Sequence, residues 1–135
     1  MASLTLNITE QASEFTEDQW RAWDAFLSGF ADSSIHLSSG VIRAGLKSPA
    51  RQVMAAMWTD ASDQIQGVAV MEDSEAISQG VDDFLEGTRG FKWAQNWLHR
   101  EGGFRFGVRV IGTPLASGPH GYRFAEGIDA YACLQ

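Results

Sequence analysis

The residues FRFGVRVIGTPLASGPHGYRF, positions 104–124, join a strand pattern to a glycine-rich loop. The first half alternates between two faces, one of which carries Phe104, Phe106, Val108 and Val110. Alternation with a period of two predicts a β-strand with one buried face. The loop that follows contains Gly112, Pro114, Ser117, Gly118, Pro119 and Gly121. Such a loop is either a plain connection or a place where backbone amides meet a ligand.

The composition predicts one soluble domain. The chain has 135 residues, of which 44% are hydrophobic and 20% charged. It contains no run of about 18 apolar residues and no secretory signal, so we expect no membrane span and a cytoplasmic location. The single cysteine, Cys133, cannot form an internal disulfide, which fits a reducing compartment. One cysteine and three scattered histidines do not form a zinc pattern, so we expect no metal.

Charge is unevenly distributed along the chain. The net charge of −7 argues against general nucleic-acid binding, which depends on neutralising phosphates. Positions 89–123 nevertheless carry six basic residues and one acidic residue. This asymmetry either marks a positive region near the glycine-rich loop or reflects solvated strand and helix faces.

The first third of the chain predicts two helices. Thr16 and Gln19 form a capping box, a pattern that starts helices. A single helical stripe then carries Trp20, Trp23, Phe26, Leu27 and Phe30. We expect this helix over residues 17–32, and a shorter helix, capped by Ser38, over residues 39–46.

Three strands are expected around these helices, over residues 4–8, 51–59 and 65–72. The polar residues 60–64 have the length of a hairpin turn between the last two strands. The residues expected to pack on the first helix are Met54, Trp58, Val68 and Val70.

The second half of the chain predicts further helices and strands. Asp73 or Ser74 can cap a helix that runs to about residue 86. The other expected elements are a helix ending at residues 99–100, strands over 104–111 and 121–124, and a helical segment over 129–135.

Two further features bear on chemistry. Residues 64–69, QIQGVA, match the Q-x-x-G-x-A form of an acyl-CoA pyrophosphate loop, but such a loop needs a helix N-terminus and these residues lie in a predicted hairpin. We therefore interpret the match as accidental. His120, between Pro119 and Gly121, is the best candidate for acid–base catalysis, the alternative being an exposed loop histidine. Cys133 lies on an apolar segment and is interpreted as a core residue.

The order of the expected elements resembles the N-terminal half of GNAT-fold acyltransferases. The resemblance covers residues 20–124 and includes the hairpin DQIQG at residues 63–67. The chain is most similar to the branch related to FemAB-type aminoacyl transferases, through GTPLASGPHGYRF at residues 112–124. Two parts of the family pattern are missing, namely the phosphate-binding loop after the acyl-binding strand and the C-terminal half.

The resemblance implies a fold and an activity. The fold would be α+β, an α/β three-layer GNAT-like arrangement with a mixed, mostly antiparallel sheet and helices packed on it. The activity would be transfer of an acyl group from acyl-CoA or aminoacyl-tRNA to an amine, with acyl-CoA as a co-substrate and no covalently bound cofactor. His120 would be the base. The anionic donor would be held by Arg105, Arg109, Gly112, Ser117, Gly118, Gly121 and Arg123.

Two questions of organisation stay open at this level. If the family assignment holds, the single domain is the N-terminal half of a larger acyltransferase, completed by a missing segment or by a partner. The competing hypothesis is a non-enzymatic binding module of α+β fold, whose exposed aromatics and basic face meet an acidic partner. A homodimer burying Trp93 and Trp97 would favour the second hypothesis.

Overall fold

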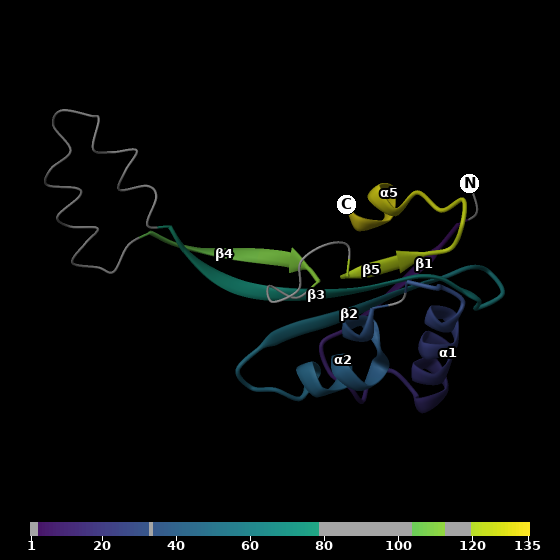
Figure 1. Ribbon diagram of the computed structural model, residues 1–135, viewed down its shortest axis with the longest axis horizontal. Helices are drawn as coiled ribbons and strands as arrows, with labels where there is room; N and C mark the ends of the chain where they lie inside the picture. The colour runs from purple at the N-terminus through teal and green to yellow at the C-terminus, as the bar shows by residue number, and fades with distance from the viewer. Residues whose placement is uncertain (1–2, 33, 79–103, 113–119) are drawn as a thin grey trace, which may run out of the picture. The chain divides into compact units, whose positions relative to one another are not determined.

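The structure is a computed structural model that describes residues 3–32, 34–78, 104–112 and 120–135, without the side chains of 76–78 and 104–106 (Figure 1). The chain divides into two compact units, Met1–Asp73 with Arg109–Gln135, and Ser74–Val108. The larger unit holds every helix that the structure describes. Residues 79–86 of the helix predicted to begin at Asp73 or Ser74, the predicted helix that ends at residues 99–100, and Trp93 and Trp97 lie outside the described residues.

The structure describes five strands, three α-helices and one 3₁₀ turn. They are β1 Thr5–Thr9, α1 Glu17–Ser28, the 3₁₀ turn η1 Ile35–Leu37, α2 Ser39–Leu46, β2 Gln52–Thr59, β3 Ile65–Ser78, β4 Phe104–Ile111, β5 Tyr122–Phe124 and α5 Ala130–Leu134.

The strands form one sheet in the order β1-β2-β3-β4, and β5 also pairs with β3. The pairs β1/β2, β2/β3 and β3/β5 are antiparallel. In the larger unit α1 and α2 lie on one side of the sheet and α5 lies on the other (Figure 1). This arrangement confirms the predicted α+β class with a mostly antiparallel sheet.

Helix α1 begins as its sequence predicts. The Thr16 hydroxyl accepts a hydrogen bond from the Gln19 N–H at 3.2 Å, and the Gln19 side chain accepts one from the Thr16 N–H at 2.8 Å. The helix ends at Ser28, four residues before the predicted end. Its last turn tightens, because the Gly29 N–H donates to the Phe26 carbonyl, and glycine has a low helix propensity.

Helix α2 has the predicted bounds, but its N-terminus is capped from a distance. Ser38 makes no side-chain cap bond to the helix, and its hydroxyl donates instead to the Ile35 carbonyl at 2.7 Å. The Asp24 carboxylate of α1 accepts hydrogen bonds from the Ser39 N–H at 2.9 Å and from the Ser39 hydroxyl at 2.5 Å. These bonds satisfy a helix-end donor and fasten α2 to α1.

The sheet has an apolar core on each face. The face under α1 and α2 is filled by residues that include Trp20, Trp23, Leu37, Val53, Ala55, Met57, Val68 and Val70. The prediction that Trp58 packs on α1 is wrong, because Trp58 lies on the opposite face, 5.0 Å from the Phe124 ring. Alternation along β2 places Met54 on that same face, away from the predicted contact. Because β2 is apolar on both faces, its hydrophobic pattern does not select a side.

Strand β3 is longer than predicted. It continues through Ser78, so the helix predicted to start at Asp73 or Ser74 is wrong over these residues. Asp73 pairs with Gln52 of β2 across the sheet, and its carboxylate binds the Arg109 guanidinium with distances of 2.7 and 2.9 Å. Asp73, which the local sequence suggests as a helix cap, therefore forms an ion pair between β3 and β4.

The β2–β3 hairpin accounts for residues 64–69. Asp60 begins the turn and accepts backbone hydrogen bonds from Ser62 at 2.8 Å and Gln64 at 3.1 Å, which lower the pKa of its carboxyl. Gly67 lies in the strand, where a Cβ atom would come within 2.2 Å of the Phe124 ring. The glycine is needed for aromatic packing, and the residues that match an acyl-CoA loop form a strand. No helix in the described part of the chain is long and apolar enough to cross a membrane.

Candidate functional site

Two glycines join β4 and β5 to the same residue of β3. The Gly112 N–H donates to the Val70 carbonyl at 2.7 Å, and the Val70 N–H donates to the Gly121 carbonyl at 2.8 Å. Strands β4 and β5 therefore follow one another along β3, and the ladder fixes the backbone at Gly112 and at Gly121.

The two glycines are also in close backbone contact. A Cβ atom on Gly121 would lie 2.4 Å from the Gly112 nitrogen and 2.5 Å from its Cα. Gly112 has a φ of +111°, which side chains rarely tolerate. The N–H of Gly112 is already bonded within the sheet, so among the described atoms this glycine has a packing role.

His120 immediately precedes this junction. It is half-buried, and its Nδ1 atom is removed from solvent with no hydrogen-bond partner among the described residues. Its ring centroid lies 6.3 Å from that of His36, which is exposed in the middle of η1. Two imidazoles that are 84 positions apart in the chain thus lie close together, with their rings tilted by 57°. A buried nitrogen without a partner is rare, since it forfeits a hydrogen bond that water would supply.

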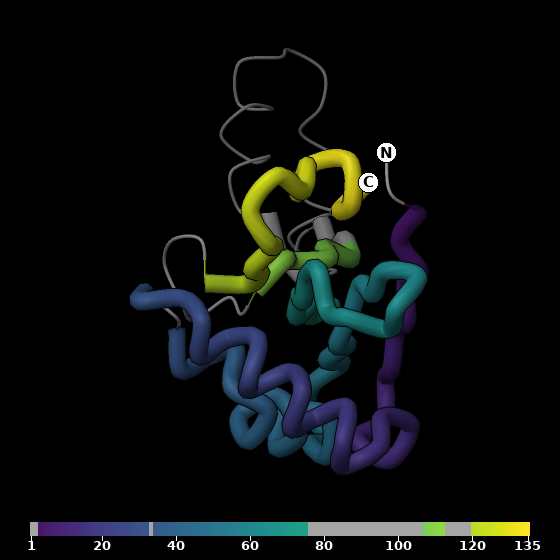
Figure 2. Tube along the Cα trace, turned by 90° about the vertical axis from the view of Figure 1, so that its right-hand side faces the viewer, coloured from purple at the N-terminus to yellow at the C-terminus, as the bar shows by residue number. Residues whose placement is uncertain are grey.

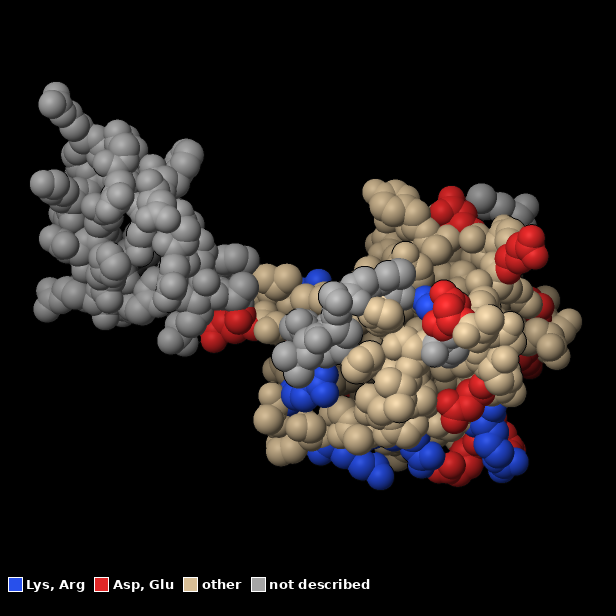
Figure 3. All heavy atoms as spheres, in the orientation of Figure 1, with Lys and Arg blue, Asp and Glu red and all other residues tan. Residues whose placement is uncertain are grey.

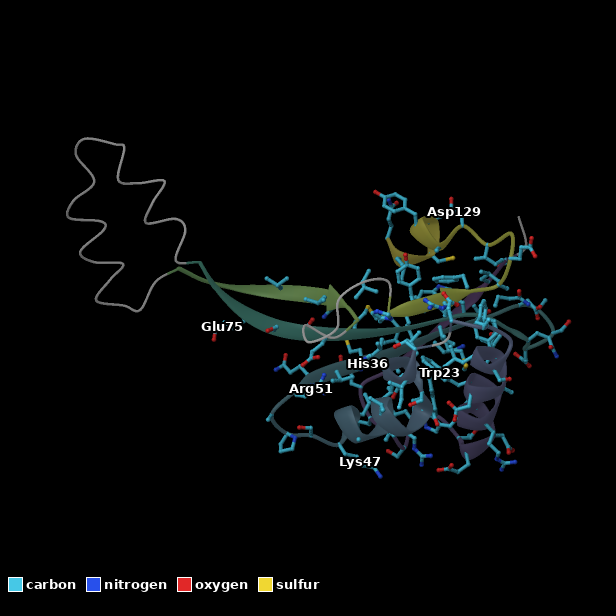
Figure 4. All side chains as sticks on the ribbon, in the orientation of Figure 1. Trp23, His36, Lys47, Arg51, Glu75 and Asp129 are labelled. Carbon is cyan, nitrogen blue, oxygen red and sulfur yellow. The ribbon has the colours of Figure 1, made fainter. Side chains whose placement is uncertain are left out.

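Helix α1 fixes the position of His36. The next residue, Leu37, is fully buried, and its carbonyl accepts a hydrogen bond from the Trp23 indole N–H at 2.8 Å. Trp23 is itself fully buried beneath the sheet (Figure 4). The η1 turn is therefore anchored by the core.

A cavity of about 130 Å³ opens between α2 and β3, and His36 is one of its lining residues. Most of its wall is aliphatic, supplied by Val41, Ile42, Val53 and Val70. Its polar lining comes from His36, Arg51 and Glu72, and Gly112 closes one side. Arg51 and His36 both lie on the α2 side of the sheet (Figure 4).

Glu72 brings a buried carboxylate to this cavity. It occupies the β3 face that carries Val68 and Val70, and only 9% of the residue is exposed. The Arg51 guanidinium binds both of its oxygens, with Nε–Oε1 at 2.8 Å and a terminal nitrogen to Oε2 at 2.5 Å. The hydrogen bond to Glu72 raises the pKa of Arg51. A two-point pair of this kind holds both charged groups in a fixed orientation.

The predicted anion-binding arginines do not converge. Arg123 pairs across the sheet with Val68, so it points to the α1 and α2 side, where it donates to the Asp32 carbonyl at 2.9 Å. Arg109 binds Asp73, which lies on the opposite face by the alternation of β3. The ion pair lowers the pKa of Asp73 and raises that of Arg109. On the face drawn in Figure 3, basic and acidic side chains of the larger unit neighbour one another and form no broad basic surface.

The remaining predicted donor contacts are not placed. Arg105 lies in β4, but its side chain is outside the described part of the structure, as are Ser117 and Gly118. Their role in binding an anion stays a prediction. Cys133 packs against the second core with Trp58 and Phe124, as expected of a core residue.

Sequence reasoning missed Glu72, Arg51 and the participation of His36. A signal for Glu72 was present, because its position continues the inward-facing series of Val68 and Val70. A carboxylate at an inward strand position demands a partner, since burying an unpaired charge is costly. Nothing local identifies Arg51 as that partner or brings His36 to His120.

Comparison with protein-family models, with curated proteins and with solved structures finds no match to this chain. The described residues also contain no group of three or more His, Cys, Asp and Glu side chains able to hold a metal ion. The functional argument therefore depends on the cavity and on the side chains around it.

Proposed function

We propose that the chain acts in acyl transfer to a small amine, and that the cavity between α2 and β3 receives the amine. The observation that carries this proposal is the unpartnered, buried Nδ1 of His120, whose ring lies 6.3 Å from that of His36, a lining residue of the cavity that contains an ion-paired carboxylate. The resemblance to GNAT-fold acyltransferases supports the choice of reaction.

The reaction needs a base. An amine attacks the carbonyl carbon of a thioester or ester, the C–N bond forms, and the C–S or C–O bond of the donor breaks. The attacking nitrogen must lose a proton, and the departing thiolate or alkoxide must gain one. Imidazole can do both in turn, and the Nδ1 atom of His120 has no hydrogen-bond partner among the described residues. This is the role proposed for His120.

Glu72 would orient the amine before attack. Each Glu72 oxygen keeps a second acceptor position besides its bond to Arg51, so it can accept a hydrogen bond from the neutral, attacking amine. The two hydrogen bonds from Arg51 fix the carboxylate in place. At about 130 Å³ the cavity is smaller than the ~300–1,000 Å³ of pockets for drug-sized ligands, so we expect a short aliphatic or amino-acid amine.

The donor would approach from the glycine junction. Because Arg109 and Arg123 lie on opposite faces of the sheet, they would not bind one phosphate group together. We therefore assign donor binding to contacts beyond these two arginines, with Arg105, Ser117 and Gly118 as the candidates from the sequence.

Thiol release from acetyl-CoA tests this function. The purified chain is incubated with acetyl-CoA and, in turn, methylamine, ethanolamine and lysine, and free thiol is measured with a chromogenic disulfide. We expect amine-dependent release that falls at least 100-fold in His120→Ala, since a general base contributes about 10²–10⁴-fold. Lys47→Ala, at an exposed position after α2, is the matched control and keeps full activity. Release that is independent of amine, or unchanged in His120→Ala, contradicts the proposal.

A second candidate, a non-enzymatic interaction module, is favoured by the edge strand β1. Its Leu6 and Ile8 side chains are 46% and 52% exposed. Absence of amine-dependent thiol release, together with association through this strand, would favour the second candidate.

A further inference from the structure

Strand β1 is an edge strand of the sheet in the part of the chain that the structure describes. It is at the end of the strand order, and among the described residues it pairs with β2 alone. Its sequence, TLNIT over Thr5–Thr9, contains no charge, proline or glycine. Edge strands in soluble proteins usually carry such features, because a bare edge offers its unpaired N–H and C=O groups to another strand. Figure 2 shows β1, in purple, along one margin of the larger unit.

The exposed aliphatic side chains of β1 share one face. Leu6 and Ile8 pair with Trp58 and Ala56 of β2, on the face opposite to α1 and α2. Both are large, apolar and about half exposed. A single exposed leucine is ordinary, but two in register on a bare edge leave apolar surface beside unpaired backbone groups.

We infer that β1 pairs with β1 of a second copy of this chain, antiparallel about a two-fold axis at Asn7. In this register Leu6 lies opposite Ile8 of the partner subunit twice, and Thr5 lies opposite the partner's Thr9 twice. All five residues of the strand then take part in the ladder. This inference is independent of the proposed catalytic function.

The alternatives fit less well. An axis at Ile8 would keep only Asn7, Ile8 and Thr9 paired within the strand. An axis at Leu6 would leave Thr9 paired outside the strand, with Ser3. In the Asn7 register Glu10 meets Leu4 beyond the ladder and no two charges meet. An isologous contact of this kind closes on itself as a dimer.

The contact is small. A five-residue ladder buries less than the ~1,600 Å² of a standard interface, so we expect reversible association that depends on concentration. Its symmetry gives a sharp experimental signature, because a residue on the axis meets its own copy. Directly opposed residues of an antiparallel pair have Cα atoms about 4.5 or 5.5 Å apart, within the range that a disulfide spans.

Disulfide trapping tests the register. Asn7→Cys is made in a Cys133→Ser background and oxidised with glutathione disulfide. The control is Ile35→Cys in the same background, because Ile35 is 73% exposed and lies in η1, away from the strand edge. We expect covalent dimer to form at least 10-fold faster through position 7 than through position 35. Equal or slower trapping at position 7 overturns the inference.

Sedimentation of the unmodified chain gives a second test. We expect the weight-average mass to rise from one copy toward two between micromolar and millimolar concentration. Ile8→Lys, which adds a charge on the edge, abolishes the rise, whereas Ile35→Lys leaves it unchanged. A chain that stays monomeric throughout, or a dimer that tolerates Ile8→Lys, overturns the inference.

Discussion

Replacing Gly121 by alanine should destabilise the sheet at the point where β4 and β5 meet β3. The new Cβ would lie 2.4 Å from the Gly112 nitrogen, 2.5 Å from its Cα and 2.6 Å from the Ile111 carbonyl carbon. All three are backbone atoms, so no side chain can rotate away. An ordinary contact needs ~3.5 Å, so the two segments must separate by about 1 Å.

That separation weakens the hydrogen bonds that Val70 makes to both glycines. Overpacking costs about 1–3 kcal/mol, and two weakened backbone hydrogen bonds add about 1 kcal/mol each. We expect Gly121→Ala to lower the free energy of unfolding by about 3–5 kcal/mol in urea denaturation. Gly40→Ala is the control, because nothing lies within 4 Å of a Cβ at that position of α2. It should raise stability by about 0.5–1 kcal/mol. Equal unfolding midpoints for Gly121→Ala and the parent would refute the close contact.

Three further perturbations probe other parts of the fold. Trp23→Phe removes the indole donor to the Leu37 carbonyl and leaves a small void, so the free energy of unfolding should fall by about 2–3 kcal/mol in urea denaturation. Gly67→Ala places a Cβ 2.2 Å from the Phe124 ring, so it should cost about 1–3 kcal/mol, and Phe124→Leu in the same chain should recover part of that loss. Because Arg109 lowers the pKa of Asp73, the stability from this pair is present above the unfolded-state carboxyl pKa and is lost as the pH falls through the native one. The difference in urea midpoint between the parent and Arg109→Gln should therefore shrink from pH 7 to pH 2.

These predictions fail in distinct ways. A parent-like midpoint for Trp23→Phe would mean that the Leu37 carbonyl does not depend on the indole. Additive losses in the Gly67 and Phe124 double variant would mean that the two side chains do not compete for space. If the midpoint difference between the parent and Arg109→Gln is the same at both pH values, the Arg109–Asp73 ion pair does not contribute to the pH dependence of stability.

Local signals predicted the elements whose ends are set locally. The capping box of Thr16 and Gln19 marked the start of α1, because both of its hydrogen bonds lie within four residues. The turn at Asp60 was equally visible, since its carboxylate bonds the backbone two and four residues onward. Where the hydrogen bonds that begin or end an element come from residues within a few positions, the sequence pattern is enough to predict that boundary.

Contacts between distant residues caused the wrong predictions. Asp73 has the sequence of a helix cap, but it is bound to Arg109, 36 positions away, and β3 continues through it. The face of the sheet on which each arginine lies depends on the register in which β4 and β5 pair with β3. Arg109 and Arg123 flank the same loop in sequence and still lie on opposite faces.

The candidate site was predictable only in part. His120 was found from its glycine and proline neighbours, whereas the burial of its Nδ1 atom could not be read from the sequence. Glu72 needed both the strand alternation and the identification of Arg51 as its partner. The site is therefore defined by packing between β3, η1 and α2, which no single stretch of sequence contains.

Histidine ring spectra measured during an amine titration test the central claim most directly. The chain is labelled with ¹⁵N-histidine, saturated with coenzyme A and titrated with ethylamine, and His120 is assigned by its loss in His120→Ala. We predict a saturable change in the His120 Nδ1 resonance that is weakened at least 10-fold in Glu72→Gln. If the His120 Nδ1 resonance does not move when ethylamine is present in millimolar excess over the protein, the assignment of this cavity to an amine substrate is contradicted.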